Sequence, residues 1–337
     1  MTVLRVDTIS GIGSDGPVFD GDLEFNSQNF FVLPKGTTTE RFYNFPGVDA
    51  ASARGLFGGG YNPELNTIDY VTIATLGNAS DFGDLITATA QLASCSSPIR
   101  GLFAGGQTPT NVNTINYVTI SATGNAQDFG DLTLVNFALS SCSSSTRGLF
   151  GGGNPGPLKI IDYVTISSTG NALRFGDLTF ERRYPSACSS STRGVFGGGH
   201  PTNTNIIDFI TISSTGNAQD FGDLTDGRYG LSSCSSPIRG IFAGGSSVPG
   251  IVNTIDYITI ASLGDAIDFG DLSATILYSA ACSSHTRGLV AGGQDPANRT
   301  AISYITFETT GNAQSFGDLT QARRLLAGCS NGHGGLG

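Results

Sequence analysis

His200, His285 and His333 are the three histidines of the sequence, and histidine is the side chain best suited to proton transfer near neutral pH. They stand at different places of a repeated unit: after a glycine triplet, in a turn between two expected strands, and near the end of the chain. His285 replaces Ser145 and Ser191 of sister units, which favours an ordinary turn substitution. This spacing predicts neither a catalytic base nor a set of metal ligands.

An aspartate recurs in every unit within the word Phe-Gly-Asp-Leu. Carboxylates bind Ca²⁺, but that ion needs several oxygen ligands from one locality, and one aspartate per unit is sparse. We therefore expect these carboxylates to bond nearby backbone amides at the end of a strand, with a calcium site as the alternative. The aspartates are Asp84, Asp131, Asp177, Asp223, Asp271 and Asp318.

An arginine opens a second recurring word, Arg-Gly-Leu-Phe-Gly-Gly. These cations could line one mouth of a channel and receive an anionic glycan or an acidic partner. Alternatively, each guanidinium could bond carbonyls of the neighbouring unit's turn. Because all six units keep the arginine, we favour this structural clasp. The arginines are Arg54, Arg100, Arg147, Arg193, Arg239 and Arg287.

One cysteine also belongs to each unit, and all but the last stand five residues before an Arg-Gly pair. Equivalent positions in neighbouring units are expected to lie beyond the ~7 Å Cα separation that a disulfide tolerates. We interpret the cysteines as free thiols that fill small apolar spaces, since one per unit lacks the paired spacing of a metal site. They are Cys95, Cys142, Cys188, Cys234, Cys282 and Cys329.

No pattern of an enzyme or of a cofactor site is legible in the sequence. Serine is abundant, but no Gly-x-Ser-x-Gly turn occurs, and the glycine doublets open no helix that could bind phosphate. The formal net charge is −10, and Lys35 and Lys159 are the only lysines, which disfavours a nucleic-acid partner. No apolar stretch approaches the ~20 residues of a membrane span, so we expect no membrane insertion.

The arginine words recur in steps of 46, 47, 46, 46 and 48 residues. A glycine-rich unit of ~40–50 residues with short apolar runs is typical of a propeller blade, because one blade cannot bury its own faces. Within residues 92–132 we expect an inner strand at the cysteine, followed by strands near 101–106, 114–120 and 128–132. The sequence therefore predicts an all-β, six-bladed propeller.

The cysteine motifs and the arginine words are offset along the chain. Arg54 has no cysteine motif before it, and the motif at Cys329 has no arginine word after it. We expect the strand around Cys329 to become the inner strand of the first blade and close the ring, so that the propeller spans residues 49–337. The alternative uses residues 47–53, but Asp49 does not match the cysteine motif.

The units resemble the kelch repeat, in which an apolar strand ends in a glycine pair and is followed by a tyrosine and a large aromatic. Gly105, Gly106, Tyr117 and Phe129 occupy those places in one unit, with phenylalanine where kelch blades usually carry tryptophan. The resemblance covers residues 50–337 and implies a kelch-like propeller. A kelch-type oxidase would need a copper site with paired histidines and tyrosines, which three scattered histidines do not make.

A narrower resemblance comes from the word Thr-Ile-Ser-Ser-Thr-Gly-Asn-Ala, at 165–172 and 211–218, and from Phe-Gly-Asp-Leu. Both look like repeat proteins of marine cyanophage virions. Residues 9–25 and 31–38 are similar to the attachment ends of such tail-fibre or virion-surface proteins. The resemblance implies a bacteriophage structural protein located in the virion, on the particle surface or tail, and implies no chemistry.

Residues 1–48 carry many apolar side chains for a segment too short to enclose them. We predict a small β or extended segment that docks onto other virion proteins or onto sister chains, with a trimer as one arrangement. A tail on the propeller's own flank is the alternative. The candidate attachment residues are Val18, Phe19, Leu23, Phe25, Phe30, Phe31 and Leu33.

Recognition is expected where the units differ, because framework positions repeat and loops carry binding. The turns between the second and third strands differ most and should project from one face. A second variable tract, at 180–184, 226–229 and 321–324, offers arginine and aromatic side chains suited to a saccharide or protein. Host-surface recognition of a glycan or protein is thus the alternative function. The candidates are Tyr61, Asn62, Gln107, Asn154, His200, Gln294, Arg182, Tyr184, Arg228 and Tyr229.

Overall fold

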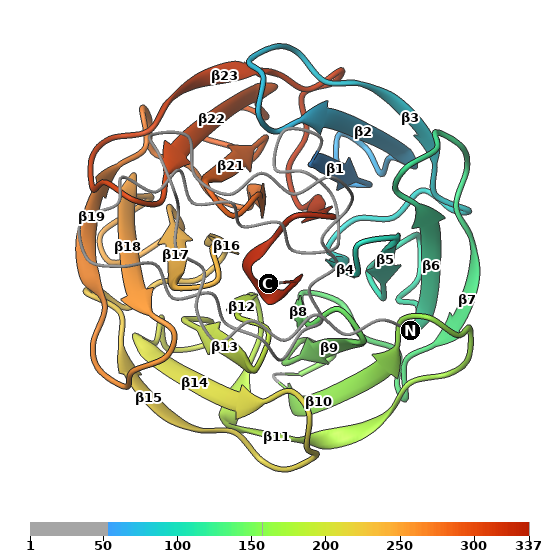
Figure 1. Cartoon of the computed structure of the whole chain (residues 1–337), viewed down its shortest axis with the longest axis horizontal. Coiled ribbons are helices and arrows are strands. Elements are labelled where there is room, and N and C mark those ends of the chain that lie inside the picture. The colour runs from blue at the N-terminus through green and yellow to red at the C-terminus, as the bar shows by residue number, and fades with distance from the viewer. Residues whose placement is uncertain (1–52, 157, 337) are drawn as a thin grey trace, which may run out of the picture. The chain divides into compact units, whose positions relative to one another are not determined.

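The computed structural model describes residues 53–156 and 158–336, which form six four-stranded antiparallel sheets arranged around one axis (Figure 1). The predicted all-β, six-bladed propeller is confirmed. The inner strand of each blade lies nearest the axis, and the next three strands follow outward.

The strands are grouped as follows. Blade 1 consists of β24 (Ala327–Ser330), β1 (Arg54–Gly58), β2 (Thr67–Thr72) and β3 (Ser80–Asp84). Blade 2 consists of β4 (Ala93–Ser96), β5 (Arg100–Ala104), β6 (Thr114–Thr119) and β7 (Gln127–Asp131). Blade 3 consists of β8 (Ser140–Ser143), β9 (Arg147–Gly151), β10 (Leu158–Thr165) and β11 (Leu173–Arg182). Blade 4 consists of β12 (Ser186–Ser189), β13 (Arg193–Gly197), β14 (Ile206–Thr211) and β15 (Gln219–Asp223). Blade 5 consists of β16 (Ser232–Ser235), β17 (Arg239–Ala243), β18 (Thr254–Thr259) and β19 (Ile267–Asp271). Blade 6 consists of β20 (Ala280–Ser283), β21 (Arg287–Ala291), β22 (Ala301–Thr306) and β23 (Gln314–Asp318).

The hydrophobic core lies between neighbouring blades. Leu102 of blade 2, for example, belongs to one cluster with Phe150 and Ile166 of blade 3. The second strand of each blade is buried on both faces, as the full burial of Leu102 and Phe103 shows. Phe129 of the outer strand is buried as well. Each blade therefore depends on its neighbours for its core, which is why the unit repeats around a closed ring.

The C-terminal strand closes the ring. In blade 1, β24 pairs with β1 in antiparallel register, with Cys329 opposite Leu56 and Ser330 opposite Gly55. This is the closure that the offset of the cysteine motifs and arginine words predicts. Of the alternative inner strand at 47–53, only Ala53 lies within the described residues.

Each cysteine packs against the glycine of an Arg-Gly pair in the next blade. A Cβ atom added to Gly148 of blade 3 would stand 2.6 Å from Sγ of Cys95 in blade 2, well inside van der Waals contact. The same relation joins Cys142 to Gly194 and Cys188 to Gly240. All six cysteines are buried and free, and burial raises the pKa of the Cys142 thiol. The repeated glycine is thus required by the thiol of the preceding blade.

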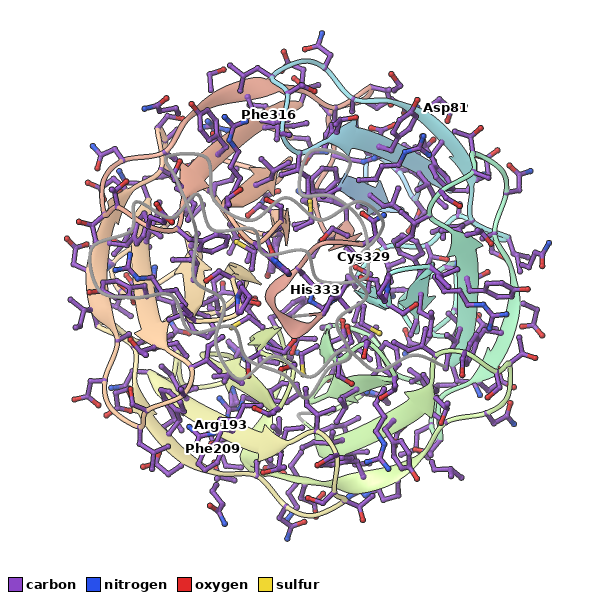
Figure 2. The ribbon with its side chains drawn as sticks, in the orientation of Figure 1. Asp81, Arg193, Phe209, Phe316, Cys329 and His333 are labelled. Carbon is purple, nitrogen blue, oxygen red and sulfur yellow. The ribbon has the colours of Figure 1, made fainter. Side chains whose placement is uncertain are left out.

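The arginine of each word spans two blades. The Arg100 guanidinium of blade 2 donates to the carbonyl of Ile166 in blade 3 at 3.1 Å and lies over the ring of Tyr117 in its own blade at 4.7 Å. Figure 2 shows the equivalent pair Arg193 and Phe209, whose guanidinium carbon and ring centroid lie 4.8 Å apart. These contacts correspond to the structural clasp, because the guanidinium bonds a carbonyl where the neighbour's third strand ends.

The repeated aspartates do not act as the expected caps. Within the described residues, none of the six carboxylates accepts a hydrogen bond from a backbone amide. Instead, the amide of Asp131 donates to Oδ1 of Asn171 in the next blade at 3.1 Å. Asp177 and Asn217 repeat this bond at 3.0 Å. The capping side chain belongs to the turn Thr-Gly-Asn-Ala of the neighbour, because that turn packs directly over Gly130 and its equivalents.

Candidate functional site

The C-terminal tail closes one end of the axial channel. After β24 the chain enters the middle of the ring, where η2 (Gly334–Leu336) lies and where Figure 2 shows His333. Nδ1 of His333 accepts a hydrogen bond from the Gly335 amide at 3.1 Å, so the proton of the neutral ring is on Nε2. Nε2 lies 3.2 Å from the Ser96 carbonyl and 3.2 Å from Oγ of Ser143. Burial lowers the pKa of His333 to about 4, so the imidazole is neutral at pH 7.

This tail also brings two histidines together, which their spacing in the sequence does not predict. His285, in the turn between β20 and β21, forms a hydrogen bond with the backbone of His333. Burial lowers the pKa of His285, and the nearness of His285 adds to the lowering of the His333 pKa. Over residues 53–156 and 158–336, however, no group of three or more histidine, cysteine, aspartate or glutamate side chains is placed to hold a metal ion.

A ring of serine hydroxyls encircles the channel near the tail. Each Oγ donates to the carbonyl of the equivalent serine in the preceding blade, as Ser143 does to Ser96 and Ser189 does to Ser143, both at 2.8 Å. The abundant serines next to the cysteines are therefore part of the framework, because their protons are already shared. The ring consists of Ser96, Ser143, Ser189, Ser235, Ser283 and Ser330.

The opposite end of the channel is a mouth formed by the six residues that stand four positions before each cysteine. All six have left-handed backbone conformations, with φ between 53° and 64°. Each amide donates to the carbonyl of the equivalent residue in the preceding blade, over 2.7 to 3.1 Å, so the hydrogen bonds form a closed ring. These mouth residues are Gln91, Ala138, Tyr184, Gly230, Tyr278 and Leu325.

A blind well begins at this mouth. Its open part has a volume of about 120 Å³, and a deeper part of about 50 Å³ extends to His333. Both parts share the layer of inner-strand residues that includes Ser94, Ser141 and Ser233. Within the described residues, a ligand can enter the well only from the mouth, because the tail occupies the other end.

Three tyrosines gather on one side of the mouth. The ring centroid of Tyr184 lies 5.0 Å from that of Tyr278 and 6.4 Å from that of Tyr229, and Tyr229 and Tyr278 are 6.2 Å apart. The rings of His200 and Tyr229 lie in an edge-to-face arrangement, with their centroids 5.4 Å apart. On the other side of Tyr184, its hydroxyl donates to Oε1 of Gln91. We call Tyr184, Tyr229 and Tyr278 the tyrosine cluster.

A glycine makes room for this cluster. Gly230 stands between Tyr184 and Tyr278 in the mouth ring, and a Cβ atom there would lie 2.8 Å from Cε1 of Tyr278. Without a side chain at Gly230, the Tyr278 ring can lean across to Tyr184. Burial raises the pKa of both tyrosines, so both hydroxyls remain protonated at neutral pH. The result is a local, asymmetric surface on a scaffold that otherwise repeats.

The variable turns lie beside the mouth. The residue before each mouth residue forms an isolated β-bridge with the first residue after a glycine pair, as Ala90 does with Gln107 and Arg183 does with His200. The six turns therefore border one end of the channel, as the sequence predicts, and the second variable tract borders the same end. Gln107 also connects to the mouth directly, because Nε2 of Gln91 donates to its Oε1 at 2.6 Å.

Only some of the predicted recognition residues come together. Tyr184, Tyr229, His200 and Gln107 meet around the tyrosine cluster. Tyr61 and Gln294 instead contact Arg324, Asn62 donates to the carbonyl of Ala322 at 2.7 Å, and the backbone amide of Asn154 donates to Asn136 at 3.0 Å. Sequence reasoning missed Gln91 and Tyr278, although their position four residues before a cysteine aligns them with Tyr184.

Arg182 and Arg228 are not recognition residues, and that prediction is wrong. Both side chains are fully buried and form ion pairs, Arg182 with Asp208 and Arg228 with Asp256. Arg182 also donates to the carbonyls of Gly198 and Ile206 at 3.0 Å each, which fastens the end of β11 to blade 4. The partner aspartate stands 26 or 28 residues further along the chain, so the pairing is not visible in the variable tract itself.

The candidate attachment residues Val18, Phe19, Leu23, Phe25, Phe30, Phe31 and Leu33 lie outside the described residues. Among the residues that the structure does describe, no helix has the length and apolar character needed to cross a membrane. No protein-family model matches the chain, and no curated protein shows significant similarity to it.

Proposed function

We propose that this chain is a non-catalytic structural protein of a bacteriophage particle, joined to the particle through residues 1–48. The proposal rests on the resemblance of its repeated words to cyanophage virion proteins. The different positions of the repeated and the variable residues in the propeller support the proposal. The repeated arginines, serines and asparagines are used in bonds between blades, whereas the variable residues surround one mouth. Such a body presents one face to a partner while its framework stays unchanged.

A deletion tests the attachment role. Phage that carry a gene lacking residues 1–45 should assemble particles without this protein, while the truncated chain remains soluble and folded. The matched control is Tyr278→Ala, which alters the mouth and should join the particle at the wild-type level. Immunoblots of purified particles measure incorporation. Wild-type levels of the truncated chain in particles would contradict the proposal.

A second candidate function, saccharide recognition at the host surface, is favoured by the tyrosine cluster. Tyrosine rings provide rigid apolar faces for a pyranose ring, and their hydroxyls provide hydrogen bonds. The well offers further polar groups, including the side chain of Ser94. A saccharide array should show saturable binding that Tyr278→Ala abolishes and Tyr61→Ala, outside the cluster, leaves unchanged. Absence of binding by the intact chain would refute this function.

A further inference from the structure

One cation stands beside the tyrosine cluster with most of its hydrogen-bonding capacity unused. Nε of Arg183 donates to Nδ1 of His200 at 3.2 Å, and this is the only side-chain bond of Arg183 within the described residues. Both terminal nitrogens of the guanidinium are therefore open. A guanidinium with two free terminal nitrogens is shaped to pair with a carboxylate through two parallel hydrogen bonds.

The charges around the mouth also favour an anionic ligand. The positive charge of Arg183 acts on the hydroxyls of Tyr184 and Tyr278, where it opposes the rise of their pKa, and no carboxylate is among the groups that act on them. His200 adds no competing charge, because burial and Arg183 lower its pKa. The positive charge of Arg183 beside the cluster therefore disfavours cationic ligands such as quaternary ammonium groups.

The repeat itself supplies a comparison. Arg324 occupies the position of Arg183 in the linker to β24, but its guanidinium bonds Oε1 of Gln294 and lies over the Tyr61 ring at 5.0 Å. The Arg324 guanidinium is therefore already occupied by contacts with Gln294 and Tyr61. The other linkers carry Ala90, Phe137, Tyr229 and Leu277 at this position, so among the six equivalent positions only Arg183 offers an open cation beside the tyrosines.

We propose that the mouth binds a saccharide that carries a carboxylate, such as a uronic or sialic acid. This inference rests on the second candidate function above. Arg183 pairs with the carboxylate, the sugar ring packs on Tyr184 and Tyr278, and the amide side chains of Gln91 and Gln107 bond ring hydroxyls. A free phosphate or carboxylate would use Arg183 but leave the tyrosine faces empty, so the sugar ring is part of the recognition.

The test compares acidic saccharides with their neutral counterparts by isothermal calorimetry on the full chain. Galacturonate trisaccharide is paired with its methyl ester, and sialyllactose with lactose. The intact chain should bind at least one acidic member roughly ten- to hundredfold more tightly than its neutral partner, as expected for a charged hydrogen-bonded pair. Arg183→Gln should remove that preference and leave binding of the neutral partner unchanged, which also shows that the variant is folded.

Arg324→Gln is the matched control and should keep the full acidic preference. Tyr278→Ala should weaken binding of acidic and neutral members alike. Equal affinities for both members of every pair would overturn the proposed carboxylate recognition while leaving saccharide binding intact. Absence of binding to any member would overturn both. An acidic preference that survives Arg183→Gln would show that the carboxylate is recognised elsewhere.

Discussion

The contact between each cysteine and the glycine of the next blade allows a quantitative prediction. In Gly148→Ala, the new methyl group would stand 2.6 Å from Sγ of Cys95, whereas ordinary van der Waals contact begins at 3.4 Å. The two atoms must therefore separate by 3.4 − 2.6 = 0.8 Å. The thiol is buried and its strand, β4, is hydrogen-bonded to β5, so relief requires a shift of the blade. We expect a loss of about 1–3 kcal/mol in the free energy of unfolding.

The thiol is the main obstacle, because the next nearest atoms are Cγ2 of Val164 at 3.4 Å and Cγ1 of Ile166 at 3.6 Å. Cys95→Ala should therefore relieve the strain of Gly148→Ala. The single change Cys95→Ala should cost roughly 1 kcal/mol for the lost packing, and the double variant should lie within about 1 kcal/mol of the wild type. The losses in the free energy of unfolding of the two single variants should therefore not be additive.

Urea denaturation followed by far-ultraviolet circular dichroism measures these differences, provided that the slope with denaturant stays constant. Gly216→Ala is the control, since a Cβ atom there meets no atom within 4 Å. It should change the free energy of unfolding by no more than ~0.5 kcal/mol. If Gly148→Ala behaves like this control, or if the double variant loses the sum of the single effects, the packing argument is wrong.

Four further predictions concern buried charge, the tail and ring closure. Asp208→Asn should lower the free energy of unfolding by about 3–5 kcal/mol because it leaves the Arg182 guanidinium buried without a counter-charge. Asp162→Asn should instead stabilise the protein at pH 7. Burial raises the pKa of Asp162 above its unfolded value and so disfavours the ionised form that dominates at pH 7. The gain in stability should vanish in acid, and equal urea midpoints of variant and wild type at pH 7 would contradict this prediction. Since the pKa of His333 falls from about 6.5 to about 4 on folding, stability should decline as pH drops through that interval, and His333→Gln should lose this part of the decline in denaturation curves measured across it. Deleting residues 331–337 should leave a folded propeller by size-exclusion chromatography, whereas deleting 326–337 removes the partner of β1 and should yield no cooperatively folding monomer; identical behaviour of the two truncations would refute the role of β24.

The buried arginines show how far the variable tract could be interpreted from sequence. Arg182 and Arg228 look like recognition residues because the tract differs between units. Their aspartate partners are on the third strand of the blade that follows, and sister units carry Asn116 or Ser303 in place of Asp208. The pairing therefore varies from blade to blade. The tract varies in sequence because different blades bury different side-chain pairs at this position. Only the packing of these residues against the next blade in the structure reveals this.

The periodic contacts could be predicted because they join neighbouring blades at a nearly constant separation in sequence. The spacing of the arginine words is sufficient to predict six blades, and the unmatched motif at Cys329 predicts the closing strand. The same periodicity predicts that a repeated arginine bonds the next blade. Each of these features is a contact between neighbouring blades that recurs around the ring, so a single sequence contains several copies of its pattern.

The mouth depends on the tertiary structure, because it combines one residue from each of six linkers. Tyr184 and Tyr278 are 94 positions apart, and they meet because Gly230 between them in the ring has no side chain. The tail is similar, since His333 reaches Ser96 and Ser143 only after the ring has closed. The sequence alone determined the number of blades and how they pair, since repetition records contacts between neighbours. Which unlike residues gather at the axis was decided by the closed ring, because only closure brings distant blades within contact of one another.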